Sequence, residues 1–337
     1  MKTKLVYVVV SSDKDVYLEQ AYISMYSAKY YMPDAHIALI TDTLSKDTFK
    51  GKREEELKYV DELVCVDLET KYNAQQRSRI LKTSVRKYIK GDFLFIDSDT
   101  IIVKPLYDID DCPFDIAACW DTHSIFEENP YRQICLEHGK LLKWPINEEK
   151  EYFNSGIIYV KDNEHCHDFY NLWLKNWLEG LKNGVSMDQP AFAKTNYMLN
   201  HIISKLDDTW NCELKHGIRF LKDAKIVHYL CTNIYLNDKV PFLLNDKDCL
   251  LKVKETIQIN QEINTIIIDP FMGLAECTHL FAGKEIFIFR TTTYTMLRNI
   301  YINHLQLFNY IEKISILILR IKEKITLIKN KLKKYYE

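Results

Sequence analysis

The stretch Phe93–Leu106, FLFIDSDTIIVKPL, decides the fold and places two acidic side chains. Residues 93–96 form a continuous apolar run bounded by polar residues, which is typical of a short buried strand in a parallel sheet. Asp97 and Asp99 follow this run, with Ser98 between them. Open α/β sheets bind ligands just beyond the carboxyl ends of their strands. The stretch therefore predicts a ligand site at Asp97 and Asp99.

The spacing of the two aspartates indicates what that ligand is. Two carboxylates beside an apolar core repel each other unless a cation lies between them. Hard divalent cations take oxygen ligands of this kind and bring phosphate groups with them. A metal–diphosphate site is the favoured interpretation. Acidic residues after strands also serve as helix caps and turn formers. Other features of the chain are needed to choose between a metal site and a structural role for the two aspartates.

Upstream of this stretch, strand patterns alternate with helix patterns. We expect strands at 5–10, 36–40 and 62–66, and helices at 17–31, 47–59 and 73–90, before the strand at 93–96. Strands separated by helices imply βαβ units and a mostly parallel sheet with helices on both faces. The sequence therefore predicts the α/β class.

The composition of the chain limits the classes of partner and the cellular compartment that we expect. The 337 residues are 47% hydrophobic and 27% charged, and the net charge is −2, so there is no electrostatic footprint for a nucleic acid. No apolar run approaches the roughly 18 residues that a membrane span needs. The nine cysteines are scattered and never spaced as CxxC, which is typical of reduced thiols. We therefore expect a cytoplasmic protein.

Four more motifs follow in the second half of the chain. A polar corner feeds an apolar strand at 153–160 (FNSGIIYV), and a helix is expected from 166 to 182. The turn Ser186–Pro190 (SMDQP) opens a further helix, where Asp188 can cap the N-terminus and Pro190 suits the first turn. The others are TWN at 209–211 and KIVHY at 225–229, a short strand that carries His228.

Together with the aspartate strand, these motifs resemble those of GT-A-fold glycosyltransferases. Within that superfamily the chain is most similar to family 8, the glycogenin and galactosyltransferase-like group that uses nucleotide-diphosphate sugars. The resemblance covers residues 1–235 and rests on the order and spacing of the five motifs rather than on any one. It implies a Rossmann-like, mostly parallel sheet flanked by helices.

The resemblance assigns a metal site. It implies that Asp97 and Asp99 bind Mn²⁺ (or Mg²⁺) and, through it, the donor diphosphate, with Ser98 between them. His228 matches the third metal ligand, and an imidazole with two carboxylates suits Mn²⁺ better than Ca²⁺. The alternative for His228 is a core histidine bonded within its strand. The family also carries a lysine shortly after this histidine, whereas here residues 228–233 read HYLCTN.

The helix before the aspartates offers substitute cations. Lys82 falls where the family carries a basic residue facing the diphosphate, and Arg79 lies one turn earlier. A cation there would stabilise the charge on the departing diphosphate; the alternative is the solvated face of an amphipathic helix. By the same resemblance, the region of Ser11, Ser12 and Tyr17 holds the nucleoside.

Two further motifs match the side of the site where the sugar is transferred. Asn154, Ser155 and Gly156 correspond to a corner where small residues admit a substrate. Asp188 and Gln189 correspond to an acidic and amide pair near the reacting sugar carbon, where an oxygen can support an oxocarbenium-like centre in a retaining mechanism. For Asp188 a helix cap is the alternative, and it does not exclude the catalytic role.

The C-terminal part changes character. We divide the chain into a catalytic domain at 1–236, an extension at 237–295 with strands at 263–268 and 286–289, and a basic helix at 296–337. Apolar residues recur there at intervals of three and four: Ile311, Ile314, Ile318, Ile321, Ile325, Ile328 and Leu332. This helix could join copies as a coiled coil, lie on the inner face of an anionic membrane, or pack on its own domain.

The leading hypothesis is a metal-dependent hexosyltransferase of polysaccharide biosynthesis. It moves a hexose from a nucleotide-diphosphate sugar, a UDP-sugar, to a glycan or lipid-linked acceptor, with retention. One alternative is a haloacid-dehalogenase-like phosphatase, because Asp97-Ser98-Asp99-Thr100 also resembles that nucleophile motif. The other is a non-catalytic scaffold whose basic helix recruits partners to a membrane.

Overall fold

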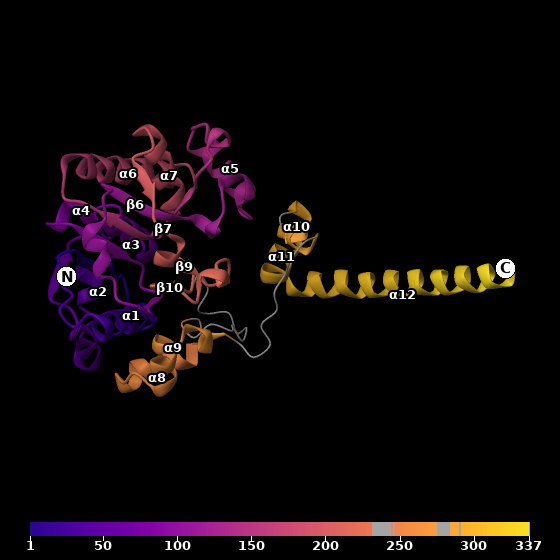
Figure 1. Ribbon diagram of the computed structural model, residues 1–337, viewed down its shortest axis with the longest axis horizontal. Helices are drawn as coiled ribbons and strands as arrows, with labels where there is room; N and C mark the ends of the chain where they lie inside the picture. The colour runs from indigo at the N-terminus through magenta and orange to yellow at the C-terminus, as the bar shows by residue number, and fades with distance from the viewer. Residues whose placement is uncertain (231–243, 245–246, 275–283, 290, 337) are drawn as a thin grey trace. The chain divides into compact units, whose positions relative to one another are not determined.

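The computed structural model describes residues 1–230, 244, 247–274, 284–289 and 291–336. The chain divides into two compact units, Met1–Thr278 and His279–Glu337. Figure 1 colours the chain from indigo at the N-terminus to yellow at the C-terminus. The two units are described separately below.

The first unit is built around a seven-stranded sheet with the order β3-β2-β1-β4-β7-β6-β8. The strands are β1 (Lys4–Val8), β2 (Ile37–Asp42), β3 (Glu62–Val66), β4 (Phe93–Ile96), β6 (Ile116–Trp120), β7 (Phe153–Val160) and β8 (Ile203–Lys205). Neighbouring strands from β3 to β4 are parallel, as are β6 and β8, while β7 is antiparallel to both of its neighbours. The predicted α/β class with a mostly parallel sheet is confirmed.

Helices cover both faces of this sheet because successive side chains of a strand point to opposite faces. On one face, Leu5 and Tyr7 of β1 pack in a core with α1 (Tyr17–Tyr31). On the other, Val6 joins a core that includes the fully buried Trp173 and Trp177. The helices of that second face are α3 (Ala74–Lys82), α4 (Val85–Tyr88), α6 (Glu164–Lys182) and α7 (Gln189–Met198). A smaller cluster forms around α5 (Arg132–Leu141).

A second, three-stranded sheet pairs the segment that follows β4 with strands from later in the chain. It has the order β5-β10-β9, with β5 at Thr100–Ile102, β9 at Cys212–Glu213 and β10 at Ile226–His228. β10 runs antiparallel to β5, and His228 is the register partner of Thr100. This pairing brings His228 beside the segment that contains the two aspartates.

Two helices differ from their predicted form. The charged helix predicted at 47–59 is instead a 3₁₀ helix, η1 (Gly51–Leu57), preceded by the short α2 (Thr43–Lys46); Arg53 and Glu56 of η1 turn inward and are buried. The helix predicted at 73–90 is divided at Thr83 and Ser84. Their hydroxyls donate to the carbonyls of Arg79 (2.8 Å) and Ile80 (2.6 Å), respectively, a competition with the backbone that often bends helices.

The strands predicted at 263–268 and 286–289 are wrong, because both segments are helical. They belong to α9 (Gln261–Ile268) and α10 (Lys284–Phe289). Asn260 caps α9 by accepting from the amide of Ile263 (2.8 Å). Ile263, Ile266 and Ile267 are spaced as one helix face and are buried, so the isoleucine-rich run is helical although its residue types favour strands.

The segment beyond β10 that the structure describes packs on α1. Tyrosine hydroxyls of α1 hold it: Tyr22 donates to the Ile257 carbonyl (3.1 Å) and Tyr31 to the Ile267 carbonyl (2.8 Å). These contacts involve α9 and the end of α8 (Lys247–Thr256), and Figure 1 shows both helices near α1. The helices share a buried core with β5 and β10, so residues up to 268 belong to the same compact unit as the sheet.

The second unit contains α10, α11 (Thr292–Asn303) and α12 (Leu305–Tyr336). The helix predicted at 296–337 is thus present in two parts, with a break at His304. The rings of Tyr301 and Phe308 pack edge to face across the break, 4.9 Å between centroids. Among the described residues, no helix combines the length and the apolar character that crossing a bilayer requires.

Candidate active site

Two aspartates and one histidine meet at the carboxyl end of β4. Asp97 and Asp99 follow that strand directly, and His228 is the last residue of β10. One ligand atom from each of the three residues lies within 4.8 Å of the others. The His228 Nε2 atom is 3.3 Å from Asp99 Oδ1. The structure therefore brings together the three residues to which the sequence resemblance assigns a metal.

The residues of this cluster leave no room for a side chain at position 156. A Cβ on Gly156 of β7 would lie 2.4 Å from His228 Cε1 and 3.0 Å from Asp97 Oδ2. The same glycine accepts a hydrogen bond from the Asp97 amide (2.8 Å). Because residue 156 is a glycine, β7 can lie in close contact with Asp97 and His228. Two carboxylates and an imidazole are ligands that suit Mn²⁺.

A chain of buried side chains orients the histidine. Asp121 Oδ1 accepts from Asn154 Nδ2 (3.2 Å), and Asn154 Oδ1 accepts from Asn211 Nδ2 (3.0 Å). Asn211 Oδ1 therefore faces His228 Nδ1, 2.9 Å away. Since an amide oxygen only accepts, Nδ1 carries a proton, so the ring that has given up its Nε2 proton to a metal is the Nδ1–H tautomer. This is the tautomer that a metal ligand needs.

Electrostatics at the cluster favour added positive charge. Burial raises the pKa of Asp97, and the nearby charge of Asp99 raises it further, while Lys82 opposes the shift. For His228, burial alone would lower the pKa, but the charge of Asp99 and their hydrogen bond raise it. A cation among these three groups would offset the repulsion between the carboxylates.

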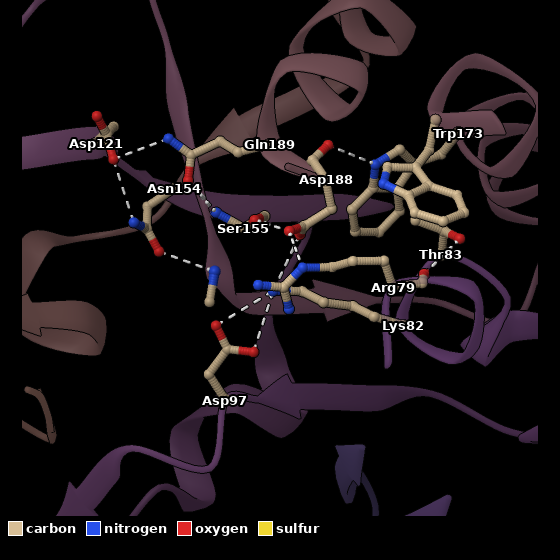
Figure 2. Close-up of polar contacts among 12 residues, drawn as sticks. Arg79, Lys82, Thr83, Asp97, Asp121, Asn154, Ser155, Trp173, Asp188 and Gln189 are labelled. Carbon is tan, nitrogen blue, oxygen red and sulfur yellow. Dashed lines mark hydrogen bonds and ion pairs between the residues drawn. The ribbon is translucent and has the colours of Figure 1, made fainter. Parts of the chain in front are cut away.

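Lys82 links the cluster to a further carboxylate, that of Asp188 (Figure 2). Its Nζ atom lies 3.0 Å from Asp97 Oδ1 and 3.2 Å from Asp188 Oδ2, and the residue is only 3% exposed. The solvated-face alternative is therefore wrong for Lys82. Arg79 is more open, with 30% of its side chain exposed, and its Nε atom lies 2.9 Å from Asp188 Oδ1.

Asp188 is held as a carboxylate by these cations. It also accepts from Ser155 Oγ (2.9 Å), and its side chain makes no capping bond to α7, which contradicts the helix-cap alternative. Burial alone would raise the pKa of Asp188, but the charges of Arg79 and Lys82 and the Ser155 hydrogen bond bring it well below its usual range. Asp188 can therefore stabilise positive charge at neutral pH.

Gln189 and Asn154 share one anchor. Asp121 Oδ1 accepts from Gln189 Nε2 (2.9 Å) as well as from Asn154, and Gln189 Oε1 accepts from the Ser155 amide (3.3 Å). The second Asp121 oxygen accepts from Asn129 Nδ2 (2.8 Å). Asp121 thus fixes both amide groups. Figure 2 shows the Asn154 and Gln189 amides converging on it.

Asp121 is not among the site residues predicted from the sequence, and no role was predicted for Asn211. Asp121 follows β6, as Asp97 follows β4, so its place after a strand was an available signal. Asn211 lies in the TWN motif that the sequence analysis quoted. Its partners lie 57 and 17 residues away, and only the folded chain brings them together.

The residues predicted to hold the nucleoside lie in the β1–α1 loop, residues 9–16, and at the start of α1. The hydroxyls of Ser11 and Ser12 are both bonded to Asp15. Tyr17, the first residue of α1, is 37% exposed. The charge of Asp188 raises the pKa of Arg79 against the effect of burial, and Tyr17 is among the groups that contribute less. The loop therefore ends near Arg79.

Among the described residues that follow His228 directly, Tyr229 and Leu230, there is no counterpart of the lysine that the family carries after the histidine. Residues 231–233 of the HYLCTN stretch lie outside the part of the chain that the structure describes. Lys82 and Arg79 are the cations that lie at the described site.

Comparisons with known proteins bear on the fold. No protein-family model matches the sequence, and no curated protein does. Among solved structures, the glycosyltransferase GlyE of Streptococcus pneumoniae TIGR4 is similar, with a TM-score of 0.50 and 14% identity over 83% of this chain and 67% of that one. An active-site mutant of LgtC is also similar, with a TM-score of 0.50 and 12% identity over 78% of this chain and 99% of that one.

The chain has the GT-A fold. The resemblance found in the sequence is thereby confirmed at the level of the fold, which the Rossmann-like sheet and its flanking helices reproduce. At these identities the likeness concerns the fold, and the activity is argued from the site itself.

Proposed function

We propose that this protein is a metal-dependent glycosyltransferase. It moves a hexose from a nucleotide-diphosphate sugar, a UDP-sugar, to a glycan or lipid-linked acceptor, with retention at the reacting carbon. The observation that carries the proposal is the three-residue cluster of Asp97, Asp99 and His228 at a strand end of a GT-A fold, joined through Lys82 to Asp188.

Asp97, Asp99 and His228 are the residues that would hold Mn²⁺ or Mg²⁺, and Ser98 lies between the two aspartates. When bound, the metal would neutralise charge on the diphosphate and act as a Lewis acid toward the leaving group. Asn211 holds the His228 ring through Nδ1, so Nε2 is the ring nitrogen that lies toward Asp99 and would bind the metal. The protein thus pre-organises the ligand set.

Lys82 and Arg79 supply fixed positive charge next to the metal cluster. Lys82 is buried between Asp97 and Asp188, and Arg79 reaches Asp188 from one turn earlier on α3. A buried cation stabilises a departing diphosphate more strongly than the same cation in water would. We assign this role to Lys82 first and Arg79 second, in place of the lysine that the family carries after the histidine.

Asp188 and Gln189 face the reacting sugar carbon in this proposal. The low pKa of Asp188 keeps it ionised, so its charge can support an oxocarbenium-like centre. Gln189 Oε1 is aimed toward the Ser155 amide because Asp121 holds its Nε2. Asn154, Ser155 and Gly156 form the floor of the sugar site, and Ser11, Ser12 and Tyr17 lie on the nucleoside side.

The direct test is release of UDP from a panel of UDP-sugars with Mn²⁺. We expect the wild type to release UDP from at least one donor, and Asp99→Asn to lower the rate by about 100-fold or more, because it removes charge from a metal ligand. Asp111→Asn, at an exposed position of η2 (Tyr107–Asp111), is the matched control. A folded wild type that releases no UDP from any donor contradicts the proposal. Mg²⁺-dependent phosphate release from a phosphomonoester would support the phosphatase instead.

We also propose that α12 attaches the enzyme to a membrane surface or to a second copy. Its described side chains include an exposed apolar series: Ile314, Ile316, Leu317, Ile318, Leu319, Ile321 and Ile325. Several lysines of the same helix favour an anionic surface. A heptad seam of isoleucines favours self-association.

A further inference from the structure

Lys254 of α8 holds the β1–α1 loop by its backbone. Its Nζ atom donates to the carbonyl oxygens of Asp13 (2.9 Å) and Asp15 (2.6 Å). These residues lie about 240 positions apart in sequence. Only 17% of the Lys254 side chain is exposed. A charged donor with two carbonyl acceptors is among the stronger hydrogen-bonding arrangements in proteins.

Asp15 in turn organises the rest of the loop. One carboxylate oxygen accepts from the amide and the hydroxyl of Ser12, both at 2.8 Å. The other accepts from the Ser11 hydroxyl and from the Tyr17 amide (3.3 Å). The side chain of Asp15 therefore closes the turn, while Lys254 fixes the backbone of the same residue.

A buried charge network places Lys254. Glu19 of α1 is fully buried, and its Oε1 atom lies 3.4 Å from Arg53 Nε and 3.5 Å from Lys254 Nζ. Arg53 also lies 4.0 Å from Glu56 and donates to Ser11 Oγ (2.8 Å). Arg53 and Lys254 thus share Glu19, and each contacts a different part of the loop.

The loop held in this way opens onto the candidate site. β1 pairs in parallel with β4, with Leu5 opposite Leu94, so the loop leaves the sheet at the edge where Asp97 leaves it. At the far end of the loop, Tyr17 is close enough to Arg79 to contribute to raising its pKa. Residues 9–16 therefore lie at the sheet edge that carries Asp97, and the loop ends near Arg79.

We infer that Lys254 is a positioning residue for the donor. By binding the carbonyls of Asp13 and Asp15, it holds the β1–α1 loop in the conformation that receives the nucleoside of the nucleotide-diphosphate sugar. α8, which follows the catalytic strands in sequence, is thereby part of the donor site without touching the donor. The inference rests on the proposed function for the identity of the ligand.

The test uses the full-length protein and three variants. Lys254→Met keeps the apolar stem and removes the charge. Lys252→Met, at an exposed position of the same helix, is the matched control. In Lys254→Met the buried carboxylate of Glu19 loses one of its two cations. The double variant Glu19→Gln with Lys254→Met removes that carboxylate as well. The measurements are UDP affinity by calorimetry with Mn²⁺, KM and kcat for the donor, unfolding temperature, and hydrogen exchange of the amides of Ser12 and Tyr17.

We expect Lys254→Met to weaken UDP binding and raise the donor KM by about ten-fold, with kcat changed less than about two-fold, because loop ordering is lost before chemistry. The Ser12 and Tyr17 amides should exchange faster. The double variant should regain unfolding temperature but not UDP affinity, whereas Lys252→Met should match the wild type.

Two results overturn the inference alone. One is a Lys254→Met variant with wild-type UDP affinity and amide exchange. The other is a double variant that regains UDP affinity together with stability, which would make the role of Lys254 purely structural. A wild type that binds no UDP in the presence of Mn²⁺ would overturn the proposed function, and with it the assignment of the loop to a donor.

Discussion

At the scale of single residues, His228 depends on three side chains that are not among the proposed metal ligands. Asp121, Asn154 and Asn211 are each at least nine-tenths buried, and each hydrogen bond of the chain sets the direction of the next. Because a carboxylate only accepts, the direction is fixed at Asp121 and transmitted to His228 Nδ1. Partners of this kind raise metal affinity by orienting the ligand.

We therefore expect Asn211→Leu to weaken Mn²⁺ binding by about 10- to 100-fold. The leucine cannot accept the Nδ1 proton, so the ring is no longer held with Nε2 toward Asp99. Asn211→Asp keeps an oxygen that accepts that proton but loses the Nδ2 donor to Asn154, so it should bind Mn²⁺ less tightly than the wild type and more tightly than Asn211→Leu. The measurement is titration of free Mn²⁺ by electron paramagnetic resonance in the presence of UDP.

The control for this pair is Asn147→Leu, at an exposed position of η5 (Ile146–Glu148). Unfolding temperatures of all variants separate loss of the site from loss of the fold. Equal Mn²⁺ affinity in folded Asn211→Leu and wild type would show that the hydrogen-bond chain does not orient His228.

Residues of the site differ in how far the sequence could reveal them. Asp97 and Asp99 follow a strand that is apolar throughout, so their place at a sheet edge follows from local pattern. Asp188 and His228 needed the family resemblance, since a lone acid or histidine in such a setting has ordinary structural roles. Asp121 acts through the side-chain amides of Asn129, Asn154 and Gln189, which come from different parts of the chain, and no local pattern encodes the direction of an amide.

At the scale of elements, η1 carries a buried acid that should make stability depend on pH. Burial raises the pKa of Glu56 from 4.5 to about 8, with a further contribution from the charge of Glu19. In the unfolded chain Glu56 titrates near its ordinary value. Between these two pKa values the folded state keeps a proton that the unfolded state has lost, so stability falls as pH rises.

We expect the free energy of unfolding of the wild type to fall relative to that of Glu56→Gln between about pH 5 and about pH 8, by up to about 1.4 kcal/mol per pH unit. Glutamine has no proton to lose, so the variant lacks this contribution. Urea unfolding across the range measures the difference.

Glu55→Gln is the control, because Glu55 is the exposed neighbour of Glu56. Its difference from the wild type should stay flat over the same range. A flat difference for Glu56→Gln as well would mean that Glu56 is charged in the folded protein.

Elements whose residue types and apolar spacing indicate the same structure were predicted well. Elements in which the two indicate different structures were not. β3, β4 and β7 begin and end where the sequence analysis placed them, and α1 does as well. The run at 263–268 is rich in isoleucine, which favours strands, but packing of Ile263, Ile266 and Ile267 into the core selects a helix. The inward turn of Arg53 and Glu56 depends on partners in α1 and could not be seen locally.

At the scale of the whole molecule, the second unit presents apolar side chains that its own helices do not bury. Ile314, Ile318 and Ile321 of α12 are each about half exposed or more. Exposed apolar surface of this extent marks a contact with a partner or a membrane. Replacing Ile314 and Ile318 with glutamate places charge on that surface without shortening the chain.

We expect Ile314→Glu with Ile318→Glu to abolish one of two properties of the wild type. If α12 lies on a membrane, the variant loses flotation with anionic vesicles; if α12 joins two copies, its mass by light scattering falls to that of a monomer. Thr326→Glu, at an exposed position of the same helix, should retain the wild-type behaviour. A wild type that is monomeric and does not bind vesicles contradicts both forms of the proposal.

The central claim is that Asp97, Asp99 and His228 bind a sugar nucleotide through a divalent metal. Calorimetric titration of UDP into the protein, with Mn²⁺ and then with a chelator, tests it most directly. We expect UDP to bind with Mn²⁺ and its affinity to fall by about 100-fold or more with the chelator, and likewise in Asp99→Asn with Mn²⁺. Equal UDP affinity with Mn²⁺ and with chelator, in a protein that stays folded, would contradict it.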